Sequence, residues 1–145
     1  MKRITLTFIL MILGSASILA QRGLNIYPFF TSEYTSNPKV TVVSLSGKQL
    51  EDRGLEKYKS ISITDDTALA DKLSQAVIKD GCKAVEKDVS YRGGQLYFGF
   101  YSLGGSGINR RYMLYLNRRP AGKEKSTLIY IEGNLDSASV KAMIK

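Results

Sequence analysis

Alternation of apolar and polar residues predicts β-strands along most of the chain from residue 40 onward. Residues 58–64 (YKSISIT) place Ile61 and Ile63 on one face and polar residues on the other, as in a strand with one buried face. Residues 40–46 (VTVVSLS) are rich in β-branched residues and end at Gly47. Strand patterns recur at residues 83–91, 96–103, 111–117 and 126–132. Because turn residues separate most of these segments, the sequence predicts a single, mostly antiparallel sheet of about six strands.

Helix signals occur at three places. The best-signalled helix runs from Asp65 or Asp66, which can cap its first turn, to about Asp80. Its apolar stripe consists of Leu69, Leu73, Ala76 and Val77. Asp136 is placed to cap a C-terminal helix, and residues 24–34 are predicted to form a short helix with Pro28 in its first turn. The prediction is therefore an α+β fold with the helices packed on one face of the sheet.

The first twenty residues have the pattern of a secretory signal peptide. Lys2 and Arg3 precede an apolar run at residues 4–13, and small residues lead to Ala20. The apolar run is shorter than the ~20 residues that a membrane-spanning helix needs. We therefore expect residues 1–20 to be a signal peptide, residues 21–39 a helical lead-in, and residues 40–145 a single domain of a protein exported to the periplasm or cell surface.

The net charge of the chain indicates which classes of partner to expect. The chain has 21 basic and 13 acidic side chains, a net charge of +8, and loss of Lys2 and Arg3 with the signal peptide would lower it to +6. A basic exported protein favours anionic glycans or acidic proteins as partners. Nucleic acid is not expected as a partner, because export removes the chain from most of it, and no segment predicts a membrane span.

The chain contains no histidine, which excludes imidazole bases, Ser-His triads and histidine metal ligands. Cys82 is the only cysteine, so neither an internal disulfide nor a cysteine metal site is expected, and no cofactor is predicted. Carboxylates could still divide the roles of acid and nucleophile in a small enzyme. Because the acids fall in loops, caps and polar strand faces, a non-enzymatic binding module is the preferred hypothesis and the enzyme is the alternative.

Tyrosine and arginine supply the candidate binding residues. On one reading, Tyr97, Tyr101 and Tyr115 lie on the open face of the sheet while Phe98 and Phe100 pack against the helices. Packing between strands is the alternative role for these tyrosines. The arginines that fall at strand ends, and so predict an exposed basic rim, are Arg92, Arg110, Arg111, Arg118 and Arg119.

Taken in order, several segments resemble small exported proteins of Bacteroides-type bacteria that form families of unknown function. The segments are VTVVSLSG, the helix ending in KDG, VSYRGGQLYFGFYSL and STLIYIEGNLD. A closer family shares the pattern YRGGxLYxGFY, found here at residues 91–101. The resemblance implies an export signal and an α+β domain, and it carries no activity or catalytic residues.

These observations leave three hypotheses. The first is a module that binds a protein or an anionic glycan through the sheet face and its basic rim. The second is a small enzyme that uses carboxylates and tyrosine, for which two convergent buried acids in a pocket would be the sign. The third is a homodimer in which a second copy covers the open sheet face.

The signal pattern generates a direct test. Mature protein purified from its native host should begin at Gln21 or within two residues of it, because Ala20 closes the apolar region with a small residue. N-terminal sequencing measures this. Soluble cytoplasmic protein that retains Met1 would contradict the expectation of export.

Overall fold

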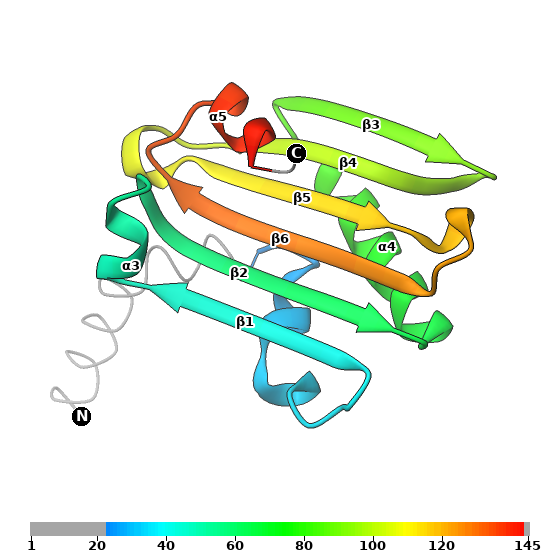
Figure 1. The fold of residues 1–145 in the computed structure, drawn as a ribbon. Coiled ribbons are helices and arrows are strands. Elements are labelled where there is room, and N and C mark those ends of the chain that lie inside the picture. Colours follow the sequence, from blue (N-terminus) through cyan, green and yellow to red (C-terminus); the bar gives the residue numbers. More distant parts are fainter. Residues whose placement is uncertain (1–22, 144–145) are drawn as a thin grey trace, which may run out of the picture.

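A computed structural model describes residues 23–143. The expected signal peptide at residues 1–20 lies outside the described residues. Within them the predicted fold class is confirmed, since the chain forms an α+β fold around one antiparallel sheet of six strands (Figure 1). No described helix is long and apolar enough to cross a membrane.

The sheet has the order β1-β2-β6-β5-β4-β3, so β1 and β3 are its edges (Figure 1). Its strands are β1 (Val40–Ser46), β2 (Leu55–Thr64), β3 (Glu86–Arg92), β4 (Gln95–Gly104), β5 (Arg111–Asn117) and β6 (Lys125–Gly133). All neighbouring strands are antiparallel. The predicted bounds of β1 and β5 are confirmed, and the other four strands differ from prediction by a few residues at their ends.

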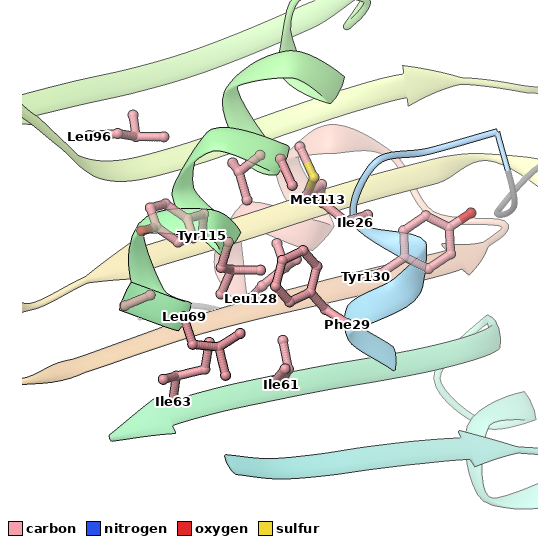
Figure 2. Packing of buried hydrophobic residues seen from close by; sticks show 14 of the residues in the cluster. Ile26, Phe29, Ile61, Ile63, Leu69, Leu96, Met113, Tyr115, Leu128 and Tyr130 are labelled. Carbon is pink, nitrogen blue, oxygen red and sulfur yellow. The ribbon is translucent and has the colours of Figure 1, made fainter. Parts of the chain in front are cut away.

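The long helix α4 (Thr67–Gly81) covers one face of the sheet (Figure 1). Asp66 caps it as predicted, since its side chain accepts a hydrogen bond from the backbone N–H of Leu69 at 3.1 Å. The predicted apolar stripe of α4 packs on side chains that project from the four inner strands (Figure 2). Sheet residues in this main core include Ile61, Ile63, Tyr101, Met113, Tyr115, Leu128 and Tyr130.

The lead-in before β1 belongs to the same core. Instead of the predicted α-helix, it forms two short 3-10 helices, η1 (Tyr27–Phe30) and η2 (Ser32–Tyr34). So short a segment gains few α-helical hydrogen bonds, and its conformation is fixed by tertiary contacts. Phe29 enters the core, and the fully buried carboxylate of Asp80 accepts hydrogen bonds from the backbone N–H groups of Asn25 and Ile26 at 2.8 and 2.9 Å.

The ring of Tyr101, which projects from β4, packs against the C-terminal end of α4. A Cβ atom at Gly81 would lie 2.4 Å from the Tyr101 ring, and one at Gly99 would lie 2.5 Å from it. The ring thus occupies space that two glycines leave open. Gly81 was predicted as a helix-ending residue, and it is the last residue of α4. Its φ is not positive, so the close approach of Tyr101 is the structural reason for glycine there.

The second face of the sheet carries a smaller apolar cluster. Phe100, Tyr112, Leu114 and Ile131 from the sheet pack with Val140 of the short helix α5 (Ser137–Ala142). Figure 1 shows α5 on the side of the sheet opposite α4, so the prediction that the helices pack on one face is wrong. Asp136 caps α5 as predicted, and its hydrogen bonds from Ser139 hold the pKa of its carboxyl below the usual value.

The orientation of α4 can be tested with a matched pair of substitutions. Leu73→Asp should cost several kcal/mol of unfolding free energy, because Leu73 is fully buried and the new carboxylate would have no partner. Lys72→Asp should change stability little, because Lys72 is exposed. Urea unfolding of both variants measures the difference, and equal midpoints would contradict the assigned face.

Candidate functional site

An apolar groove of about 590 Å³ lies on the second face of the sheet, beyond the part that α5 covers. Its floor is formed by Tyr58, Ser60, Ile129 and Ile131, on the adjacent strands β2 and β6. The other lining residues are Val43, Leu45, Leu50, Arg53, Leu55, Leu114 and Met143. This is a partly open apolar surface of a size that suits the side chains of a bound molecule.

The walls of the groove come from three different elements. On one side is the single helical turn α3 (Lys48–Glu51), whose Leu50 is buried. On another is the end of α5, where Met143 is 46% exposed. On the outer side, Val43 and Leu45 of the edge strand β1 are 37% and 38% exposed, because no described element lies beyond them on this face.

Helix α5 is fixed to the sheet by the edge strand β3. Glu86 of β3 accepts a hydrogen bond from Ser137 at 2.8 Å and forms an ion pair with Lys141 at 3.7 Å. The Lys141 ammonium also lies 4.8 Å from the centre of the Phe100 ring. The hydroxyl of Tyr112 donates a hydrogen bond to the carbonyl of Leu135, just before the helix. These contacts place the end of α5, and Met143 with it, at the border of the groove.

The prediction of an open tyrosine face is wrong. Tyr101 and Tyr115 are 3% and 1% exposed and lie in the main core under α4, and burial raises the pKa of Tyr101. Phe98 and Phe100 instead belong to the cluster on the second face. Tyr97 is half-buried, and the Arg92 guanidinium lies 5.7 Å from the centre of its ring.

The structure divides the five predicted arginines between two ends of the sheet. Arg110 and Arg111 stand at the start of β5, and Arg118 and Arg119 follow its end, ~20 Å away at ~3.4 Å per residue. Arg92, at the end of β3, lies at the same end of the sheet as Arg118 and Arg119. The structure therefore does not bring the five arginines together into one basic surface.

The two arginines at the start of β5 donate hydrogen bonds to backbone carbonyls. Arg110 donates to Leu135 at 3.4 Å, and Arg111 donates to Leu103 at 3.1 Å. Both bonds tie β5 to a neighbouring segment of the chain. Arg110 and Arg111 therefore have a structural role, because they join neighbouring segments of the chain.

The sequence predicted that Arg119 is part of an exposed basic rim, and the structure shows that this prediction is wrong. The Arg119 side chain is 8% exposed and donates to Asp71 of α4 at 2.7 Å and to the amide oxygen of Asn117 at 3.0 Å. Burial alone would lower the pKa of Arg119, but its hydrogen bond and charge interaction with Asp71 raise it above the usual value. Arg119 thus links β5 to α4, whereas Arg118 is exposed.

The buried carboxylates are in separate networks. Asp80 holds the lead-in, while Glu132 accepts a hydrogen bond from the Tyr130 hydroxyl at 2.9 Å and lies 3.5 Å from the Lys57 ammonium. Burial and the neighbouring Glu132 raise the pKa of Tyr130. Neither acid lines the apolar groove. The pair of convergent buried acids that would favour the enzyme hypothesis does not occur in this groove.

Sequence reasoning missed the groove residues. The available signal was the alternation within β1 and β2, which places Val43, Leu45, Tyr58 and Ser60 on one face. Alternation alone could not show that this face would remain partly open, because the positions of α3 and α5 decide it.

Residues 13–144 match the model of DUF6108, a family of unknown function. The match includes every described strand and helix. Comparisons with curated proteins and with solved structures give no match.

The two neighbouring arginines allow a matched test. Arg119→Gln should lower the unfolding free energy by on the order of 1–3 kcal/mol, because it removes charged hydrogen bonds that join β5 to α4. Arg118→Gln should change it by less than about 0.5 kcal/mol, since Arg118 is exposed. Urea unfolding measures both values. A midpoint for Arg119→Gln equal to that of the native chain would show that the Asp71 ion pair contributes little.

Proposed function

The chain belongs to the DUF6108 family of unknown function, and we propose that it is an exported, non-enzymatic module that binds another protein through the apolar groove. The single observation that carries this proposal is the partly uncovered second face of the sheet. Val43, Leu45 and Met143 are exposed around a groove whose floor includes Ile129 and Ile131. Exposed apolar side chains that gather around one groove are typical of sites that a partner covers.

Export to the periplasm or cell surface is supported by the signal pattern at residues 1–20. Cleavage after Ala20 would keep the described part of the lead-in, residues 23–39, joined to the domain. Asn25 and Ile26 are held by Asp80. Cleavage would therefore leave these contacts of the lead-in intact.

A protein partner is favoured over an anionic glycan by the chemistry of the groove. Among the described residues, Arg53 is the one charged residue that lines it, and the other polar side chains are those of Tyr58 and Ser60. A polysulfated or polyphosphorylated ligand needs several cations close together, and the arginines are divided between two ends of the sheet. Apolar side chains of a protein match the groove better.

Site-specific crosslinking in the native host tests this function. A photoreactive phenylalanine analogue at Leu45 or Met143 should form an adduct of one discrete mass with a partner protein. The same analogue at Gln75, an exposed residue on α4, should give no such adduct, because α4 lies on the opposite face. Denaturing gel electrophoresis with mass spectrometry identifies the product.

A second substitution links the adduct to the groove. Val43→Asp should reduce the adduct formed from Met143 at least about tenfold, because it places a charge in an apolar contact. Gln75→Asp makes the same charge change on the α4 face and should leave the adduct unchanged. Equal adducts from the two faces, or none from the groove, would contradict the proposed function.

A further inference from the structure

The two edges of the sheet differ in chemistry. The edge strand β3 has the sequence EKDVSYR, with four charged residues, and its pairing with β4 has an irregularity at Ser90 and Tyr91. Charges and bulges are the features that prevent an edge from pairing with another strand. The edge strand β1 has the sequence VTVVSLS, without a charge or a proline, and pairs with β2 in an unbroken register of seven residues. One edge is therefore protected and the other is open to pairing.

The register shows which backbone groups of β1 face outward. Lys39 is opposite Thr64 and accepts a hydrogen bond from its N–H at 2.9 Å. Every second residue after Lys39 therefore also bonds to β2, namely Thr41, Val43 and Leu45. The N–H and C=O groups of Val42 and Ser44 consequently point away from the sheet. No turn or loop backbone hydrogen bond between described residues reaches these two residues.

The open edge is continuous with the groove. Val43 and Leu45 are the outermost side chains of the groove, and both belong to β1. A strand added beside β1 would place alternate side chains next to Val43 and Leu45, on the groove side of the sheet. The outward backbone groups of β1 and the apolar groove are therefore parts of one surface.

The charges around β1 indicate what kind of strand it accepts. The exposed Lys39 precedes β1 and the exposed Lys48 follows it, and neither forms an ion pair within the part of the chain that the structure describes. If two copies paired antiparallel about Val43, Lys39 of one copy would approach Lys48 of the other. Like charges at both ends disfavour a second copy and favour carboxylates.

We infer that β1 takes up an extended segment of another protein as a seventh strand, and that this segment is uncharged in its middle and acidic at its ends. The inference rests on the proposed function and specifies its mode of binding. Main-chain hydrogen bonds to Val42 and Ser44 supply affinity, and alternate side chains reach the groove. Lys39 and Lys48 pair with the acidic ends.

The probe for this inference is a fluorescein-labelled synthetic peptide of sequence DTVTVTD, followed by fluorescence anisotropy. It should bind the native protein at least about tenfold more tightly than KTVTVTK, because the acidic ends meet lysines. A version of the acidic peptide that is N-methylated at alternate residues lacks the N–H groups of one edge. This N-methylated peptide should bind at least about tenfold more weakly than the unmodified acidic peptide, because it has lost backbone hydrogen bonds. Its side chains are the same, so they cannot cause the difference.

Ser44→Pro removes the outward N–H of residue 44 and should weaken peptide binding at least about tenfold, while Ser44→Ala keeps this N–H and should bind like the native chain. Circular dichroism checks that both variants fold, and the N-methylated peptide provides the same test if Ser44→Pro does not. Equal binding by Ser44→Pro and Ser44→Ala, or by the two forms of the peptide, would overturn strand addition.

The outcomes separate the inference from the function on which it rests. If Val43→Asp abolishes peptide binding but Ser44→Pro and N-methylation leave it unchanged, the groove binds without strand addition and only the inference fails. If a folded Val43→Asp variant keeps its partner adduct in cells, the proposed function fails. A concentration-dependent dimer that Ser44→Pro converts to a monomer would show that the added strand comes from a second copy, which overturns the proposed partner.

Discussion

The C-terminal end of α4 joins three parts of the protein. Asp80 binds the backbone of the lead-in through two N–H groups, and the next residue, Gly81, leaves room for the ring of Tyr101. One helical end therefore fixes both the lead-in and the helix itself relative to the sheet. A buried carboxylate is costly unless it is fully hydrogen-bonded, so the position of the lead-in is coupled to the folding of α4.

The number of helices limits how much of the sheet can be covered. A six-stranded sheet is ~24 Å wide at ~4.8 Å between strands, whereas a helix with its side chains is ~10 Å across. Among the described residues, helix α4 and the lead-in together cover one face, whereas the six residues of α5 and the single turn α3 cover only part of the other. Because α5 is held over β4, β5 and β6 by Glu86 and Val140, the surface above β2 and the neighbouring β1 stays uncovered. The groove follows from this shortage of helix.

The sequence predicted the strands well because alternation and turn residues are local signals. The bounds of β1 and β5 and the caps Asp66 and Asp136 needed no tertiary information. By contrast, tertiary information was needed to decide which side chains of a strand point toward α4. On β4, both alternating sets are aromatic, so alternation could not decide whether Tyr101 or Phe100 faced α4. The space left by Gly81, 20 residues earlier, decides it, and no local pattern contains that contact.

The candidate site was harder to predict for the same reason. Arg118 and Arg119 are adjacent and chemically identical, yet only Arg119 is near Asp71, which lies 48 residues away in the sequence. By contrast, the difference in charge between the edge strands β1 and β3 is visible in their sequences once the strand order is known. The charges of β3 serve both to protect an edge and to hold α5, because Glu86 is shared between these roles. The edge strand β1 is uncharged and lies beside the groove. The partly uncovered groove follows from the position of α5, which is held beside β3 and away from β1.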